Sequence, residues 1–498
     1  MATRAVATKT KAPALSMSKR QAYMLGIIGE AEKVAKIQNI SIGMEDRMSS
    51  GMLCLDLMLG KGGLAPGMYT FSGGEQSCKT TTQLVVMAAS VYQKVEMRVL
   101  WDAENSSGSS TDYVQNVVNT VLRDKRTISV EDLFGVKNKK GDFIQLPVVY
   151  YQDTNSLEGF FDFFAALLRR LPDKRYEDGQ WWYIFPKDTK GMERAKAMDL
   201  EIDVARSKAN GAIYAPAEDG SPQALILNDG WAAMLPEAMD EEEKKAGLGL
   251  LARKFAEHLP RVKGKLRAKR VILIGTNQLK EKPMAFGDPR YESGGNSLRF
   301  NSDCRIWHTA RALSGVPYKP KGKGMIEEED SVEFPGTKDV YRYVSLEARK
   351  NKLGVPNRTT WIKVWISDGE GKARGLCPVF DTFHALVETG QISGKLTGAR
   401  DKLLLNVNSL GEAKKNINWT EFKTLILGTR KEMDTVLEKI GYKTGIGIRA
   451  GLFRMSRRGL LEELYVARRT GANRLTSSAT ESAEDLVDEE DETDNGED

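Results

Sequence analysis

The chain has 498 residues, of which 41% are hydrophobic and 28% charged, as is typical of globular proteins. It contains no apolar run of about eighteen residues and no apolar core of a secretory signal, so neither a membrane contact nor export is expected. Its four cysteines and three histidines are widely scattered, which disfavours disulfides and zinc sites and suits a cytoplasmic location.

Charge is unevenly distributed along the chain. The last eighteen residues contain eleven acidic side chains and no Lys or Arg; without them 57 acids face 73 bases, a net charge of +16 instead of +5. A basic body predicts a polyanionic partner, for which an acidic tail at 476–498 would compete. The alternative is that this disordered tail only keeps the protein soluble.

At the N-terminus we expect a disordered basic arm over residues 1–16, rather than a transit peptide, and then a helix with a linker over residues 17–50. Ser18 can cap the helix, with Gln21 three residues further on. Apolar side chains then recur at helical spacing at Met24, Ile27, Ile28, Ala31 and Val34. Because such a stripe needs a cover, we expect it to pack on the protein's own core or on a neighbouring subunit.

Between residues 51 and 377, short apolar segments predict strands. They are "GMYTFSG", "MRVLWDAEN", "PQALILNDGW", "KRVILIGTNQ", "CRIWHTARAL", "VYRYVSLEARKN" and "TTWIKVWIS". The first four are near-continuous apolar runs, typical of strands that helices cover on both faces. The predicted fold class is therefore α/β, with a largely parallel central sheet.

Two stretches interrupt this pattern. Residues 173–220 are polar with poor periodicity and predict an insertion, and residues 314–338 are rich in Gly, Pro and charge and predict a mobile surface loop. From residue 378 to 475 the strand signals fade and helical patterns follow. We expect a small, mostly helical C-terminal domain there.

The stretch "SGGEQSCKTT" has the layout of a phosphate-binding P-loop, or Walker A motif, between a strand and a helix. Backbone N–H groups and the helix N-terminus would hold phosphate oxygens, Lys79 would reach the β- and γ-phosphates, and the Thr80 hydroxyl would bind Mg²⁺. The residues predicted to bind nucleotide here are Gly73, Gly74, Glu75, Gln76, Ser77, Cys78, Lys79, Thr80 and Thr81.

Cys78 stands where a P-loop usually has glycine. If this position needs a positive φ, cysteine costs about 1 kcal/mol; if φ is negative, only room for a Cβ is needed. Cysteine is small enough that nucleotide binding should survive. A thiol beside Lys79 at a helix N-terminus is also expected to have a lowered pKa and raised reactivity.

Two acids follow predicted strands. Asp229 ends "ALILND" and could hold Mg²⁺ together with Thr80. Glu104, near the end of "VLWDAEN", could polarise the water that attacks ATP. An acid in such a place is otherwise a helix cap or part of a solvated turn. The phosphate loop and two such acids in one chain favour a common site.

Together these segments resemble the RecA family of recombinases, including its phage members of the UvsX type. "SSGMLCLDLMLGKGGLAPGMYTFSGGEQSCKTT", "RVLWDAEN" and "LILNDGWAAMLP" are similar to the approach to the family's ATP site, its catalytic-glutamate strand and its Walker B strand. The resemblance covers roughly residues 17–377 without the insertions, and departs at Cys78 and in a DNA loop one residue shorter. It implies a RecA-like P-loop ATPase core with Glu104 as catalytic residue and Asp229 as the metal-side acid.

The most specific segment is "ILIGTNQLKEKPMAFGDPRYESGGNSLRFNSDCRI", which resembles the nucleotide-sensing glutamine, here Gln278, and the second DNA-binding loop. Basic side chains of such a loop would meet phosphates, and an apolar wedge would separate base steps. The DNA contacts implied are Lys280, Lys282, Phe286, Arg290, Gly294, Gly295 and Asn296, with Arg253 after the first DNA loop.

Two further roles come from the resemblance. "EARKNKLGVP" is similar to the lysine pair that reaches the ATP of the adjacent protomer, which puts Lys350 and Lys352 there. Tyr113 is the candidate for stacking on adenine.

The resemblance implies a DNA-dependent ATPase that uses ATP and Mg²⁺, forms a helical filament on single-stranded DNA and catalyses homologous pairing and strand exchange with duplex DNA. A single-strand-binding protein and a loading mediator would be further partners, in the host bacterial cytoplasm if the chain is phage-encoded. Two alternatives stay open: a RecA-fold ring-forming DNA motor or helicase-like ATPase, and a non-hydrolysing DNA-binding filament protein.

Overall fold

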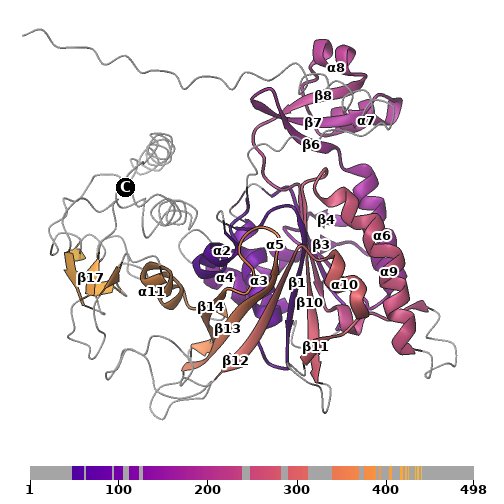
Figure 1. The fold of residues 1–498 in the computed structure, drawn as a ribbon. Helices are drawn as coiled ribbons and strands as arrows, with labels where there is room; N and C mark the ends of the chain where they lie inside the picture. Colours follow the sequence, from indigo (N-terminus) through magenta and orange to yellow (C-terminus); the bar gives the residue numbers. More distant parts are fainter. Residues whose placement is uncertain are drawn as a thin grey trace, which may run out of the picture.

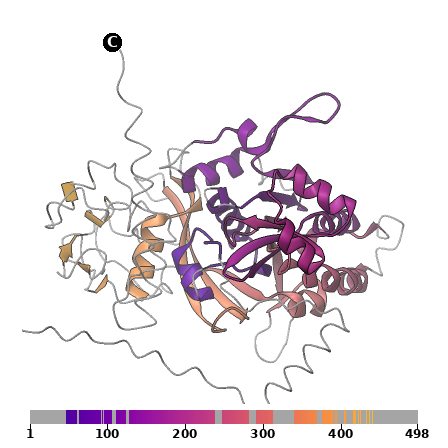
Figure 2. The same ribbon diagram turned by 90° about the horizontal axis from the view of Figure 1, so that it is seen from above.

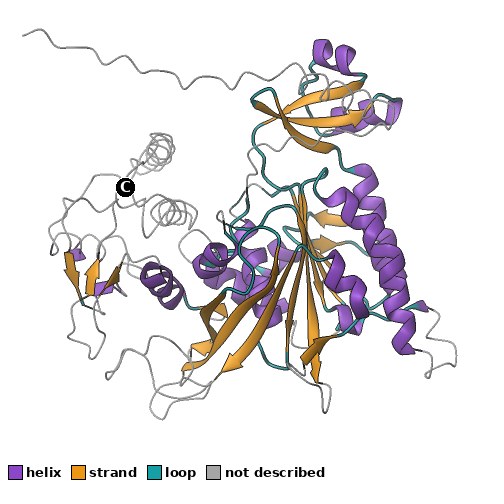
Figure 3. Ribbon diagram, viewed as in Figure 1, coloured by secondary structure: helices purple, strands orange, loops and turns teal. Residues whose placement is uncertain are grey.

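The computed structural model describes residues 47–388, with gaps at 61–62, 92, 94, 105–110, 123–126, 238–246, 282–289, 312–338 and 369–374, and short pieces between residues 392 and 439. Helices cover both faces of one large sheet, and a smaller β-sheet unit lies beyond one end of it (Figure 1; Figure 3). The predicted α/β class is confirmed.

The central sheet has ten strands in the order β15-β14-β13-β12-β1-β10-β9-β2-β5, with β11 beside β10. The run from β12 to β5 is parallel, whereas β11, β13, β14 and β15 are antiparallel to their neighbours. All the predicted strands are present. The bounds are β1 Gly67–Gly73, β2 Met97–Asp102, β5 Tyr150–Asp153, β9 Ala224–Asp229, β10 Val271–Glu281, β11 Arg290–Glu292, β12 Cys304–Arg311, β13 Asp339–Asn351, β14 Thr359–Asp368 and β15 Gly375–Leu376.

Helices pack on the two faces of this sheet and bury its central strands. All seven residues of β1 are buried, which explains why its sequence lacks the polar alternation of a half-exposed strand. On one face lie α2 Leu53–Leu59, α3 Lys79–Val91, α4 Thr111–Leu122 and α5 Val130–Phe134, and on the other α6 Leu157–Arg170, α9 Gly247–Leu266 and α10 Gly295–Asn301. A short hairpin, β3 Val136–Lys137 and β4 Phe143–Gln145, follows α5, and the 3-10 turn η2 Trp231–Ala233 follows β9.

The predicted insertion is a small folded unit rather than an irregular polar stretch. Its antiparallel sheet consists of β6 Asp173–Glu177, β7 Gln180–Pro186 and β8 Ala212–Ala217, with α7 Thr189–Ala197 and α8 Val204–Asn210 around a core of its own. The β6–β7 turn is Asp178-Gly179, with φ of 52° and 86°. An Asp-Gly pair is a strong hairpin signal, which the polar residues around it had hidden.

The insertion follows α6 and precedes β9, so it lies beyond the amino ends of the parallel strands (Figure 1). The chain continues past the sheet with α11 Pro378–Glu388, β16 Ile392–Ser393, β17 Leu403–Leu405 and β18 Lys415–Ile417, on the opposite side of the molecule from α6 and α9 (Figure 2). The described part of the C-terminal domain therefore contains a three-stranded sheet besides a helix.

Several predictions fall outside the described residues: the N-terminal arm and helix, the 314–338 loop and the acidic tail. In the described ranges, no helix is both long and apolar enough to cross a membrane.

Candidate phosphate-binding site

The predicted phosphate loop connects the carboxyl end of β1 to the amino end of α3. Residues 74–76 are exposed at its crest, and α3 begins at Lys79. Gly73 has no room for a side chain, because a Cβ there would lie 2.2 Å from Ser77 Oγ and 2.7 Å from the His308 carbonyl oxygen. A crest above a helix N-terminus offers unpaired backbone N–H groups to an anion.

Cys78 adopts a left-handed backbone conformation with φ of 59°. Of the two alternatives raised by the sequence, the positive φ is the one observed, so cysteine here costs about 1 kcal/mol relative to glycine. The side chain is half-buried against the core below the loop. This burial raises the pKa of the Cys78 thiol to about 11, outweighing the nearby cations Arg342 and Lys79, which lower it. The expectation of a lowered thiol pKa is wrong.

Lys79 lies over its own loop. Its Nζ donates to the Gly74 carbonyl oxygen at 2.7 Å and to Ser77 Oγ at 3.4 Å. Burial lowers the pKa of Lys79, while Glu104 and Asp229 act in the opposite direction. Since both of its acceptors are uncharged, the ammonium can exchange them for a stronger anionic acceptor at the crest.

Arg342, on β13, holds the crest from the side. Its guanidinium donates to the backbone oxygen of Gln76 and, at 2.5 Å, to Gln76 Oε1. Gln76, like Cys78, has a positive φ, 53°. Sequence reasoning missed Arg342, because only the order of β13, β12 and β1 in the sheet brings it next to the loop.

Asp229 ends β9 directly behind the loop. Its Oδ1 accepts from Thr80 Oγ1 at 3.1 Å and from Thr276 Oγ1 at 2.6 Å, while its buried Oδ2 has no hydrogen-bond partner among the described residues. Burial, with a smaller contribution from Glu104, raises the pKa of Asp229 to about 6.

Asp229 and Thr80 together could hold Mg²⁺. A carboxylate oxygen without a protein partner lies beside a threonine hydroxyl, and both are oxygen ligands of the type that Mg²⁺ takes. Within the described ranges no group of three or more His, Cys, Asp or Glu residues could hold a metal ion. Mg²⁺ at nucleotide sites needs only one or two protein ligands, because phosphates and water supply the rest.

Glu104 and Gln278 lie where the sequence predicted them, at the same edge of the sheet. The Glu104 N–H donates to the Asp229 carbonyl oxygen at 2.9 Å, and Glu104 Oε1 lies 3.0 Å from the place a Cβ would take on Gly230. Gln278 is the register partner of Gly73 and is exposed. The structure therefore brings the loop, both acids and the glutamine together.

Tyr113 lies on α4, near the same site. Its hydroxyl shares a 2.5 Å hydrogen bond with Thr81 Oγ1 in the first turn of α3, and its ring packs against the core. Tyr113 therefore lies beside the phosphate loop, and its role in stacking on adenine stays a prediction.

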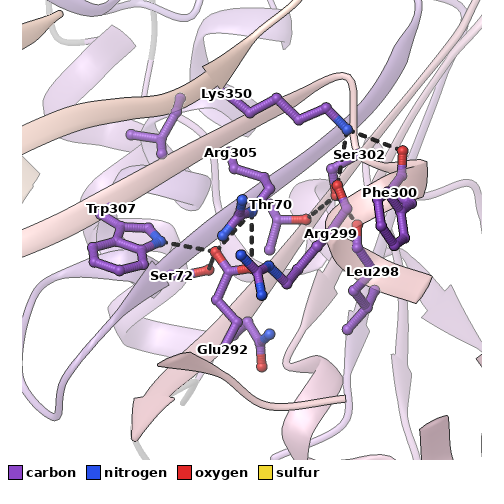
Figure 4. Close-up of polar contacts among 12 residues, drawn as sticks. Thr70, Ser72, Glu292, Leu298, Arg299, Phe300, Ser302, Arg305, Trp307 and Lys350 are labelled. Atoms are coloured by element: carbon purple, nitrogen blue, oxygen red, sulfur yellow. Dashed lines mark hydrogen bonds and ion pairs between the residues drawn. The ribbon is translucent and has the colours of Figure 1, made fainter. Parts of the chain in front are cut away.

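The lysine pair lies elsewhere. Lys350 Nζ donates to the carbonyl oxygens of Arg299 and Phe300 at 2.8 and 3.0 Å, at the end of α10 (Figure 4). Lys352 is 3.7 Å from Asp303 Oδ1, and the Asp303 N–H donates to the Met68 carbonyl oxygen, near the start of β1. Met68 and Gly73 are five residues apart, so about 16 Å of strand separates the level of Lys352 from the phosphate loop. The register partner of Lys350 is Arg305, which pairs with Thr70, so Lys350 lies about 10 Å of strand from the loop.

The residues predicted to contact DNA are partly described. Lys280 is exposed on β10, and Arg290 on β11 lies over the Trp307 ring at 5.0 Å. Gly294 and Gly295 have φ of 86° and 72° and turn the chain into α10, which includes Asn296. Arg253 is exposed on α9. Lys282 and Phe286 lie outside the described residues.

A buried carboxylate that sequence reasoning missed, Glu292, links the base of that loop to β1. Its carboxylate accepts from Ser72 Oγ at 3.0 Å, Trp307 Nε1 at 2.8 Å and Arg305 Nε at 2.9 Å (Figure 4). Glu292 is 4% exposed and Ser72 directly precedes Gly73. A single acid in "RYESGG" gives no signal of this network, since its partners come from β1 and β12.

Comparisons with known proteins find similarity to one family. Residues 217–316 match the RecA N-terminal domain family, a segment that includes Asp229, Gln278 and Gly294 but not the phosphate loop.

Among curated proteins, the chain is similar to Protein RecA of Aquifex pyrophilus, with 31% identity over 160 residues, 32% of this chain and 40% of that protein. It is also similar to Protein RecA of Mesoplasma florum, with 27% identity over 168 residues, 33% of this chain and 45% of that protein. With Protein RecA of Aquifex aeolicus the identity is 26% over 265 residues, 52% of this chain and 66% of that protein. The first two matches span less than half of those relatives' length, and together the matches support a relationship to the RecA family.

Proposed function

We propose that this chain is a DNA-dependent ATPase that assembles on single-stranded DNA and catalyses homologous pairing and strand exchange. The observation that carries the proposal is the convergence of Lys79, Asp229 and Glu104 on one phosphate loop, with Thr80 3.1 Å from Asp229. Phosphoryl transfer depends on positioning and charge stabilisation by such groups. The similarity to RecA proteins supports recombination among the uses of this site.

Each residue has a part in hydrolysis. The loop N–H groups and Lys79 would bind the phosphates of ATP, while Thr80 and Asp229 would hold Mg²⁺, which when bound neutralises phosphate charge. Glu104 would orient the attacking water and take its proton as the water oxygen bonds to the γ-phosphorus and the bond to the β-phosphate oxygen breaks. Arg342 would keep the crest of the loop in place through Gln76.

Gln278 would connect ATP to DNA. It lies beside Gly73, and three residues further on β10 ends at Glu281, which directly precedes residues 282–289 of the predicted DNA-binding segment. A side-chain amide that bonds the γ-phosphate would therefore pull on the base of a DNA-binding loop.

Lys350 and Lys352 lie too far from the loop of their own chain to serve it. We infer that they act on the ATP of an adjacent copy, as an arginine finger does, so that hydrolysis requires a filament. A single-strand-binding protein and a loading mediator are proposed as further partners, and the UvsX-like subtype and the bacterial cytoplasm as the proposed context.

The test is ATP hydrolysis with and without single-stranded DNA, for wild type and Lys79→Ala. We expect stimulation by DNA, and a loss of at least about 100-fold in the variant because a phosphate-side cation is removed. Equal background rates in all four conditions would leave a non-hydrolysing DNA-binding filament instead. Closed rings on single-stranded DNA in electron micrographs would favour a ring-forming motor.

A further inference from the structure

An open cleft of about 410 Å³ lies where the insertion joins the core, between the carboxyl ends of α6 and α9 and the start of β6. Its cationic side chains are Arg169, Arg175, Lys265 and Lys269, and its one acidic side chain is Asp173. The net charge of the lining is therefore +3. The cleft is at the amino ends of the parallel strands, the opposite end of the sheet from the phosphate loop (Figure 1).

Two of these cations already have internal partners. Asp173 is 2.5 Å from Arg175 and 2.8 Å from Lys269, and Lys269 Nζ also donates to the Leu171 carbonyl oxygen at 2.6 Å. Arg175 and Lys269 thus neutralise the Asp173 carboxylate, and Lys269 also stabilises the negative carboxyl end of α6.

Arg169 and Lys265 differ from that pair. Both residues are exposed, and neither has an ion pair with a carboxylate of the described residues. Internal partners thus account for two of the four cations, Arg175 and Lys269, and the other two remain available to an external anion.

Gly264 is an exposed residue of the cleft lining. A Cβ built on this residue meets no atom within 4 Å, so packing does not require glycine, although glycine inside a helix costs about 0.5–1 kcal/mol relative to alanine. Gly264 and Ala268 thus present only backbone and a methyl group to the cleft, which allows a bulky phosphate chain to approach closely.

Polar and aromatic contacts hold the insertion against the core. The insertion is held to the core by Glu96, which accepts from Tyr183 at 2.5 Å and from Lys174 at 3.4 Å. Arg270, at the start of β10, lies over the Trp181 ring at 4.6 Å. A site between two such units is preorganised, which reduces the entropy lost on binding.

The positive charge continues along α9. Arg253, Arg261 and Lys265 are exposed on this helix, and twelve residues at 1.5 Å each separate the first from the last, about 18 Å. Arg261 pairs with Glu257 at 3.5 Å on the exposed surface, where such a pair contributes little. A linear series of cations matches a polymer of phosphates better than a single small anion.

We propose that the cleft and this side of α9 bind the sugar–phosphate backbone of duplex DNA, as a second DNA site that rests on the proposed function. None of the eight lining residues is aromatic. Sites for single strands combine cations with aromatic side chains that stack on bases, whereas a duplex offers only phosphates to such a surface. The insertion would thereby give the filament a place for the incoming duplex.

The test uses the full chain with Arg169→Glu and Lys265→Glu combined. The matched control combines Lys190→Glu and Lys208→Glu, two exposed positions on α7 and α8 with the same change in net charge. Fluorescence anisotropy measures binding to a duplex of about 30 base pairs and to oligo-dT, between about 50 and 200 mM salt. A second variant, Gly264→Glu, adds a negative charge where there is room for it.

We expect both cleft variants to bind duplex at least about tenfold more weakly, and the double variant to lower the slope of log affinity against log salt by about 2. Oligo-dT binding and DNA-stimulated ATP hydrolysis should stay at the wild-type level. The control should change duplex affinity by less than about twofold, because neither Lys190 nor Lys208 lines the cleft.

Equal duplex affinities of cleft and control variants would overturn the proposal. So would a result in which the cleft variants lose thermal stabilisation by inorganic tripolyphosphate but keep duplex binding, since the cleft would then hold a small phosphate compound. Failure of the proposed function would give a different result. ATP hydrolysis by the wild-type protein would then not respond to oligo-dT, whatever the duplex affinity of the cleft variants.

Discussion

Two buried carboxylates of the central sheet, Asp229 and Glu292, have opposite surroundings. The Glu292 carboxylate accepts hydrogen bonds from Ser72, Trp307 and Arg305. Asp229 accepts from two threonine hydroxyls and has one oxygen without a hydrogen-bond partner among the described residues. A carboxylate with all its bonds made stabilises a fold, whereas one with unused capacity indicates a missing ligand. The difference separates a structural part of this sheet edge from the part proposed to bind Mg-ATP.

The largest expected effect tests the structural side. Glu292→Ala would leave Arg305 buried without its partner, and we expect it to lower the free energy of unfolding by about 3–5 kcal/mol in urea titrations. Glu347→Ala is the control, since the Glu347–Arg349 pair is about 30% exposed and should contribute less than about 1 kcal/mol. Similar losses for the two variants would mean that the Glu292 network adds no stability.

The reactive side is tested by Asp229→Asn. Because the pKa of Asp229 is raised to about 6 from 3.8, the folded chain binds this proton more tightly than the unfolded chain. The cost of burying the ionised form therefore grows as pH rises from about 4 to about 6 and is constant above. We expect the variant to be more stable than wild type by on the order of 1–3 kcal/mol at pH 7, with no difference near pH 4.

The same variant should lose the thermal stabilisation that Mg²⁺ and ATP give to wild type, and for wild type this stabilisation should decline below pH 6. Thermal unfolding with and without Mg-ATP measures both effects. An Asp229→Asn variant that is less stable than wild type at pH 7, or equally stabilised by Mg-ATP, would contradict the contrast with Glu292.

The smallest effect concerns the loop itself. Cys78→Gly should stabilise the protein by about 1 kcal/mol, because glycine adopts the observed φ of 59° without strain, and nucleotide affinity should be retained. Cys78→Ala keeps the Cβ and should bring no such gain, so thermal unfolding of the two variants separates backbone strain from the loss of the thiol. A loss of nucleotide affinity in Cys78→Gly would assign the thiol a role in binding.

The sequence predicted the strands and the loop because these depend on local patterns. Continuous apolar runs identified the buried strands, and the glycines and lysine of the loop identified its position. Glu292, Arg342 and the cationic cleft were beyond reach, since each depends on segments that are far apart in the chain. The thiol of Cys78 was mispredicted because its sequence neighbours show the cations but not the burial that outweighs them.

The insertion has a consequence for protein engineering. Its two ends meet, since Gln223 Nε2 donates to the Pro172 carbonyl oxygen at 2.9 Å, and it has a core of its own. A short linker in place of residues 173–222 would therefore leave the central sheet intact, and the excised unit could be transplanted into a related protein that lacks it. The deletion variant and the chimaera together would show whether the insertion functions independently of the chain in which it occurs.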